Sequence, residues 1–322
     1  AGQSWQKTLF VDENTGGIDL VIHPENPDHL FAAMWQKTRR AWDFTEAGNG
    51  SAIYQSEDGG KTWSKCTGAN NGFPTGEGVG RIGLSLMTEN ETTHLYAILD
   101  NYFRRDAEKD EDDQLTKAQL KLMSKSSFLA LDKKKISTFL KQNRFPKKYD
   151  YEKVIDMIKS DIILPKALAE YLEDANSMLF ETPVIGAEVY HSKDLGKTWT
   201  KTHDDYLDRV YNSYGYYFGQ IRVSPRDHKK LYIMGVPILR SDDGGASWIS
   251  IGGNNVHSDH HDLWVNPART GHLINGNDGG INISYDDGEN WIKCNHPPLG
   301  QFYYIAVDHA KPYRVYGGLQ DN

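Results

Sequence analysis

Histidine and aspartate side chains are concentrated in one short segment, HSDHHD (257–262), which offers imidazole and carboxylate groups within six residues. If the segment is extended, alternate residues point the same way, so the side chains of His257, Asp259 and His261 would converge. Such a trio could bind a divalent metal ion. A hydrogen-bonded histidine network without metal is the alternative. The sequence implies no other cofactor.

A second group of residues occupies one slot of a repeated strand. Aligning the second strand of each repeat places these residues in that slot: Trp35, Asp100, Val236, Asp278 and Gln320, with Asp321 one residue further on. In a ring of repeats, Asp100, Asp278 and Asp321 would surround the mouth of a central channel, with Trp35 and Gln320 as ligand-binding neighbours. Two carboxylates there could act as general acid and base on a glycosidic bond. Alternatively, Asp278 completes a turn and binds local backbone, or it binds a ligand or metal.

Tyrosines are concentrated in the segment YNSYGYYFGQ (211–220). On an exposed loop, Tyr211, Tyr214, Tyr216 and Tyr217 would offer flat surfaces to sugar rings or contacts to a polypeptide. An equally good interpretation places half of them in the core between repeats.

The elements that must position these residues are defined by a repeated octet, S-x-D-x-G-x-x-W. It occurs four times: Ser56–Trp63, Ser192–Trp199, Ser241–Trp248 and Ser284–Trp291. Gly2 and Trp5 match the Gly and Trp of a fifth octet. In a tight turn of this kind Asp accepts hydrogen bonds from backbone N–H groups, Gly takes a positive φ, and Trp folds back over the hairpin. We therefore expect structural roles for Asp58, Trp63, Asp194, Trp199, Asp243, Trp248, Asp286 and Trp291.

The octet resembles the Asp-box, or BNR repeat, of sialidase-like, xyloglucanase-like and sortilin-like β-propellers. The resemblance implies an all-β fold, a β-propeller of four-stranded antiparallel blades with about four complete blades and partial blades at both ends. Alternating apolar residues around each octet fit antiparallel hairpins, and the repeat length fits blades. The octets would join the third and fourth strands on one face of the disc. The chemically active loops would share the opposite face.

An insertion separates two parts of the repeat array. Residues 1–100 and 184–322 carry the blades, and residues 101–183 begin with a charged run and continue with apolar residues at helical spacing. Thr116 and Gln119 match a helix capping box. We expect a charged, α-helical insertion over the loop face. The incomplete repeats at both ends indicate a piece of a longer propeller.

Three functions are compatible with the resemblance. The arginines in the expected first strands, Arg81 and Arg222, lack the R-I-P setting of sialidases, so sialidase activity is not expected. The segment NDGG, which contains Asp278, is similar to the D-x-G-G segment of xyloglucanase-like glycoside hydrolases but is one residue shorter. The runs HPENPDHLFAA and YGGLQDN resemble sortilin-like receptors. The leading hypothesis is a sortilin-like propeller that binds a polypeptide or glycan on its loop face. The alternatives are a glycoside hydrolase and a structural module of a surface assembly.

Composition limits the partners and the location. The formal net charge of −8 with no basic stripe argues against nucleic acid, and no apolar run is long enough to span a membrane. Other protein chains could bind the insertion or the open blade edges. The resemblance implies a secreted, periplasmic or cell-surface protein, although the chain shows no signal peptide.

Overall fold

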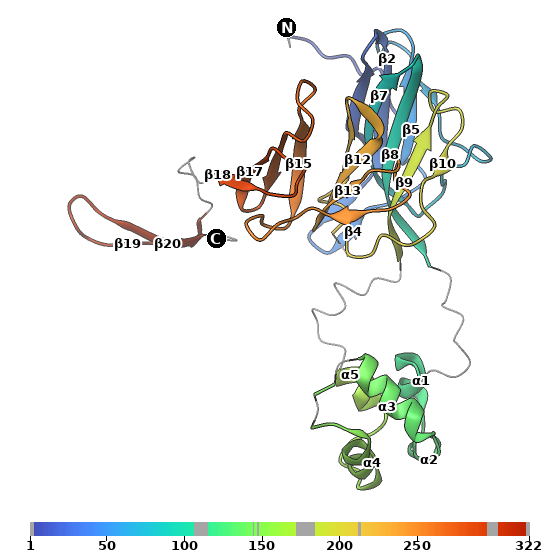
Figure 1. Cartoon of the computed structure of the whole chain (residues 1–322), viewed down its shortest axis with the longest axis vertical. Coiled ribbons are helices and arrows are strands. Elements are labelled where there is room, and N and C mark those ends of the chain that lie inside the picture. The colour runs from blue at the N-terminus through green and yellow to red at the C-terminus, as the bar shows by residue number, and fades with distance from the viewer. Residues whose placement is uncertain are drawn as a thin grey trace. The chain divides into compact units, whose positions relative to one another are not determined.

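The computed structural model describes residues 3–105, 115–143, 145–146, 148–171, 184–211, 214–294 and 302–319. The chain divides into two compact units, Ala1–Phe103 with Val184–Asn322, and Arg104–Pro183 (Figure 1). Gln320 and Asp321, two of the expected site residues, lie outside the described residues.

The first unit contains four antiparallel sheets of four strands each. The strands of the first sheet, in spatial order, are β1 (Thr15–His23), β2 (Asn26–Gln36), β5 (Ala52–Ser56) and β6 (Ser64–Lys65). Those of the second sheet are β7 (Val79–Glu89), β8 (Thr92–Arg104), β9 (Val184–Ser192) and β10 (Thr200–Lys201). The strands of the third sheet are β11 (Gln220–Ser224), β12 (Asp227–Met234), β13 (Ile238–Ser241) and β14 (Ile249–Ser250). Those of the fourth sheet are β15 (His260–Val265), β16 (Leu273–Asn277), β17 (Gly280–Ser284) and β18 (Ile292–Cys294). Each strand lies beside its predecessor, as in propeller blades.

Two short hairpins complete the strands of this unit. One is β3 (Thr38–Arg40) with β4 (Asp43–Thr45), and the other is β19 (Phe302–Val307) with β20 (Val315–Leu319). The second hairpin corresponds to the first two strands expected for a partial blade. The fourth strand expected at the N-terminus is not formed, since residues 3–14 contain no strand and Trp5 is 92% exposed. A lone strand with no third strand beside it cannot complete ladder hydrogen bonds.

Apolar clusters fill the space between successive sheets. Phe31 and Ile53 of the first sheet pack with Leu84 and Leu99 of the second. Similar clusters join the second sheet to the third and the third to the fourth. Residues 95–99 of β8 are all almost completely buried because this strand is covered on both faces. Burial of a large apolar side chain stabilises the fold by about 1.5–3 kcal/mol, which holds the strand ends in place for the loops.

The octets form a repeated turn between the third and fourth strands of each sheet. In the third octet, Ser241 Oγ donates to Asp243 Oδ1 (2.8 Å) and accepts from Gly245 N (2.8 Å). Asp243 Oδ1 also accepts from Ser247 N (2.9 Å), and Trp248 Nε1 donates to the Gly245 carbonyl (3.0 Å). The Ser–Asp–Gly bonds recur in the other three octets. The repeated sequence therefore encodes one repeated hydrogen-bond pattern.

The second unit is helical and has its own core. Its helices are α1 (Lys117–Leu122), α2 (Lys125–Leu129), α3 (Lys133–Gln142), α4 (Tyr151–Lys159) and α5 (Lys166–Tyr171). The capping box predicted at Thr116 and Gln119 is present. Leu120, Phe128 and Ile158 are fully buried in the core of this unit. None of the helices described in the chain is long and apolar enough to span a membrane. Covering of the loop face by this unit stays a prediction.

Candidate functional site

The chemically active loops lie at the strand ends opposite the octets. In three sheets the octet begins opposite the first residue of the second strand that pairs with the third strand. Leu30 pairs with Ser56, Leu231 with Ser241 and Leu273 with Ser284. The other ends of these second strands lead to Trp35, Val236 and Asp278. We call this side the loop face, formed by residues 35–48, 78–81, 100–102, 206–211, 214–219, 257–261 and 278–280.

Four buried polar atoms at the loop face have no hydrogen-bond partner among the described residues. They are Glu46 Oε2, Arg81 Nε, Asp100 Oδ2 and the Tyr211 hydroxyl, here called the Asp100 cluster. The cluster is one electrostatic group, because Glu46 and Arg81 both act on Asp100, and Asp100 and Arg81 both act on Tyr211. One further such atom, His29 Nε2, belongs to the octet end of β2. Unpaired buried polar groups are costly, so a concentration of them at one place indicates a functional site.

Backbone irregularities position the Asp100 cluster. The pairing of β7 with β8 shifts register between Val79 and Ile82, and this bulge sets the direction of Arg81, whose Nη1 donates to the Tyr216 carbonyl (2.9 Å). A Cβ atom added to Gly215 would lie 1.9 Å from Asp100 Oδ2. The crossing from β10 to β11 therefore closes directly over the Asp100 carboxyl, and only glycine allows this approach.

Burial controls the protonation of the two acids in the cluster. Asp100 is 4% exposed, and burial raises its pKa to about 7, with a smaller contribution from the nearby carboxyl of Glu46. Burial also raises the pKa of Glu46. Hydrogen bonding to Tyr102 lowers the pKa of both carboxyls but does not cancel the effect of burial. Asp100 therefore exchanges its proton near neutral pH and can act as donor or acceptor.

A strip of aromatic and cationic side chains forms the outer part of the loop face. We define the aromatic strip as Lys37, Arg39, Phe44, Tyr216 and Tyr217. The Phe44 and Tyr216 rings meet edge to face with centroids 4.8 Å apart, and Tyr217 lies 4.4 Å from Tyr216. The Arg39 guanidinium lies over Phe44 at 5.1 Å and over Tyr216 at 5.9 Å. These rings can stack on a ligand while the two cations attract an anionic one.

The strip is connected to the Asp100 cluster through Trp35. Lys37 Nζ lies 4.7 Å from the Trp35 ring, and Arg81 lies 5.9 Å from the same ring. The indole Nε1 of Trp35 donates to the Glu46 carbonyl (2.7 Å). Trp35 is only 6% exposed, so it supports the strip from beneath rather than facing solvent.

Asp278 lies in a different group of residues from Asp100. Its Oδ1 lies 2.7 Å from His261 Nε2, and the two side chains are 33% and 47% exposed. The His261 ring stacks on Phe218 with centroids 5.6 Å apart. Asn277, whose Oδ1 accepts from Gly279 N (3.0 Å), caps the local turn. The carboxylate of Asp278 therefore contacts an imidazole and remains accessible.

The structure does not bring His257, Asp259 and His261 together in the expected way. Asp259 has a φ of 64°, so the segment is not extended at its centre, and β15 begins only at His260. His260 is turned inward, where its Nδ1 bonds Asn275 (2.8 Å). In the part of the chain that the structure describes, His257, Asp259 and His261 are not among the residues that bring one ligand atom each within 4.8 Å of one another. Metal binding by this loop stays a prediction.

The four tyrosines of the segment 211–220 divide between core and surface. Tyr211 is fully buried and Tyr214 packs against the core of the second and third sheets. Tyr216 is half-buried and Tyr217 is 51% exposed. Sequence reasoning missed Glu46, Lys37, Arg39 and Phe44 as site residues, and it considered Arg81 only as a possible sialidase arginine. A signal for the first four existed in QKTRRAWDFTE (36–46), where three cationic residues are followed closely by two aromatic residues and an acid.

Comparisons with known proteins place the chain beside several solved structures. No family model and no curated protein matches it. It is similar to a GH74 xyloglucanase from Xanthomonas campestris, with 13% identity, a TM-score of 0.47, and coverage of 94% of this chain and 33% of that one. It is also similar to a Hadza microbial sialidase, with 15% identity, a TM-score of 0.40, and coverage of 86% and 45%. YCF48 bound to D1 peptide gives 11% identity, a TM-score of 0.32, and coverage of 91% and 73%. The chain thus spans about a third of the length of the xyloglucanase.

Proposed function

We propose that the loop face binds an extended polymer with anionic groups, either a polypeptide or a glycan, along the aromatic strip. The observation that carries this proposal is the concentration of four unpaired buried polar atoms next to the aromatic strip, in which Phe44 and Tyr216 are half-buried and Tyr217 is exposed. Binding loops on a rigid scaffold have this composition, with apolar flat surfaces and a few polar groups that fix orientation.

The charges of the face favour an anionic ligand. Lys37 and Arg39 are exposed beside the rings, and Arg81 lies partly buried behind them. Glu46 interacts electrostatically with both Arg39 and Lys37, and burial raises its pKa, which opposes ionisation of its carboxyl. The local charge is therefore positive, although the whole chain carries −8. A uronate-containing glycan or an acidic peptide would match this face.

The two ligand classes are separated by one screen with two arms. The whole chain is applied to an array of neutral and acidic glycans and to a library of extended acidic and neutral peptides. Saturable binding in one arm identifies the class, and competition by salt tests the electrostatic contribution. Absence of saturable binding in both arms would contradict the proposal. Export of the protein, expected from the resemblance, stays a prediction.

Glycoside hydrolysis is a second candidate because Asp278 keeps an accessible carboxylate beside His261. Hydrolysis requires a second carboxyl about 5–10 Å away that also reaches the glycosidic bond. Asp100 is buried beneath Gly215 and does not meet this requirement, and Asp321 lies outside the described residues. The described residues therefore support binding more than hydrolysis.

A further inference from the structure

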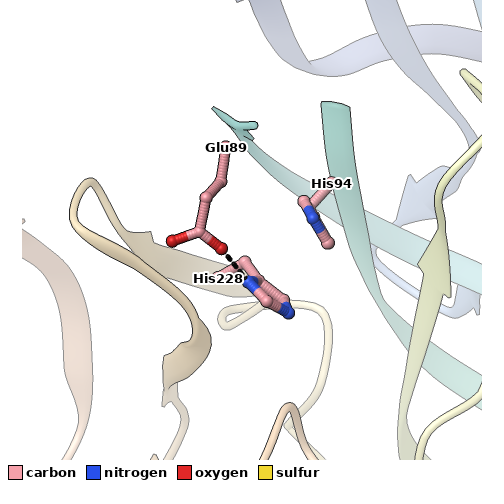
Figure 2. Close-up of side chains that lie close together, drawn as sticks. All are labelled: Glu89, His94 and His228. Atoms are coloured by element: carbon pink, nitrogen blue, oxygen red, sulfur yellow. Dashed lines mark hydrogen bonds and ion pairs between the residues drawn. The ribbon is translucent and has the colours of Figure 1, made fainter. Parts of the chain in front are cut away.

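A cluster of histidines with one glutamate lies at the octet side of the first unit, away from the loop face. Glu89 is the last residue of β7, His94 lies near the start of β8, and His228 lies near the start of β12 (Figure 2). Glu89 and His94 belong to the second sheet and His228 to the third. The cluster therefore spans the boundary between two neighbouring sheets.

The ligating atoms of these residues are already close together. One atom from each of Glu89, His94 and His228 lies within 4.8 Å of the others, and no other trio meets this criterion among the described residues. The Glu89 carboxylate contacts His228 Nδ1 (Figure 2). The rings of His94 and His228 are stacked with centroids 3.9 Å apart. The side chains of Glu89 and His228 are 33% and 23% exposed, so an ion can reach the cluster from solvent.

Neighbouring groups hold the cluster in place. His94 Nδ1 lies 3.0 Å from His191 Nε2, and the His191 ring stacks on Tyr96 at 4.2 Å. The Tyr96 hydroxyl donates to the His228 carbonyl (2.9 Å). Metal-binding histidines are commonly oriented by such contacts through the ring atom that does not bind metal.

We propose that Glu89, His94 and His228 bind a divalent ion of the zinc class and that the ion ties the second sheet to the third. Two imidazoles and a carboxylate are suitable zinc ligands, and water would complete a tetrahedral site. Because the ligands come from two sheets, the bound ion cross-links elements that otherwise meet through side-chain packing and hydrogen bonds. Binding to the folded state alone then raises stability in proportion to ion concentration and affinity.

Binding requires a small rearrangement of the two rings. Ligands in a tetrahedral zinc site lie about 3.3–3.6 Å apart, given metal–ligand bonds of about 2.0–2.2 Å. The stacked rings direct their lone pairs along planes only 24° apart. One imidazole, His94 or His228, therefore rotates about its Cβ–Cγ bond when the ion binds. The stack is lost in the bound form.

The test uses the metal ion alone as the probe. The whole chain is treated with chelator, dialysed, and titrated with Zn²⁺ by calorimetry, while Co²⁺ loading is followed through its visible absorption. We expect one ion per chain at this cluster, tetrahedral Co²⁺ bands, and a thermal unfolding midpoint that rises with Zn²⁺. Glu89→Gln should weaken binding at least tenfold, and His228→Ala should abolish it.

Matched variants keep the outcome decisive. His272→Ala removes a half-buried histidine from the equivalent turn of the fourth sheet, where it bonds Asn266 and its ring lies 4.6 Å from the Tyr285 ring. This variant should leave binding unchanged. If His228→Ala does not fold by circular dichroism, the conservative Glu89→Gln decides. No saturable binding, or wild-type binding by Glu89→Gln, would overturn the proposal. Loss of the ion in His261→Ala, with binding retained in His228→Ala, would assign it to the 257–262 loop and also overturn the proposal.

Discussion

The Gly215 backbone closes over the carboxyl of Asp100, and a Cβ atom at position 215 would lie 1.9 Å from Asp100 Oδ2. This contact joins the tyrosine-rich crossing to the end of β8. It also explains why an acid that the strand alignment assigns to an open channel mouth is only 4% exposed.

Gly215→Ala should destabilise the protein, because the buried Asp100 carboxyl has little room to move. Overpacking of this kind costs about 1–3 kcal/mol. Urea unfolding of the variant measures the loss. Gly276→Ala is the matched control, since a Cβ atom there would meet nothing within 4 Å. Equal stability of the two variants would show that the crossing is not tightly closed over Asp100.

Asp100 should make stability fall as pH rises toward neutral. Its folded pKa of about 7 lies above the ordinary value of 3.8, so between these values the folded state binds more protons than the unfolded state. Stability from this group is present at acid pH and is lost on passing through the folded pKa, by roughly 4 kcal/mol in total. Asp100→Asn should flatten that part of the unfolding profile. The exposed control Asp43→Asn should not, and an unchanged profile in Asp100→Asn would contradict the assignment.

The octet tryptophans should differ in their contribution to stability. Trp199 is 4% exposed, and its Nε1 donates to the carbonyls of Gly196 (3.1 Å) and Cys66 (3.2 Å), the latter directly after β6 of the first sheet. Trp63 is half-buried and donates to Gly60 of its own octet (3.0 Å). Trp199→Ala should cost about 3–5 kcal/mol, and Trp63→Ala clearly less, as measured by chemical denaturation. Similar losses would mean that the octets act only within their own turns.

The wild-type protein should not hydrolyse polysaccharides faster than the Asp278→Asn variant does. The described side-chain partner of Asp278 is His261, and Asp100, the other described residue of the expected catalytic acids, is covered. Reducing-sugar release from neutral and acidic polysaccharides provides the measurement. Release by the wild type that Asp278→Asn loses would support the glycoside hydrolase alternative instead.

The fold was readable from local patterns, whereas the site depended on backbone details. The octet residues make the hydrogen bonds of their own turn, and the alternation of apolar and polar residues around each octet predicts the strands. The pairing of residues such as Leu231 and Ser241 therefore follows from nearby sequence. Asp259 takes a positive φ, which interrupts the extended backbone expected for the trio at 257–261 and which alternation alone does not reveal. The burial of Asp100 depends on Gly215, which is distant in sequence. Glu89 and His228 were missed for the same reason, since they meet only when two sheets pack.

The affinity of the loop face for the polymer selected by the array tests the central claim most directly. Arg39→Ala and Tyr216→Ala remove one cation and one ring of the aromatic strip, which contact each other. Tyr285→Ala is the control: it removes an exposed ring outside the loop face, over which the Arg269 guanidinium lies at 4.7 Å. Calorimetry should show at least tenfold weaker binding for the first two variants, equivalent to about 1.4 kcal/mol or more, and no change for Tyr285→Ala. Unchanged binding in Arg39→Ala and Tyr216→Ala, or equal loss in all three variants, would contradict the assignment of the ligand to this face.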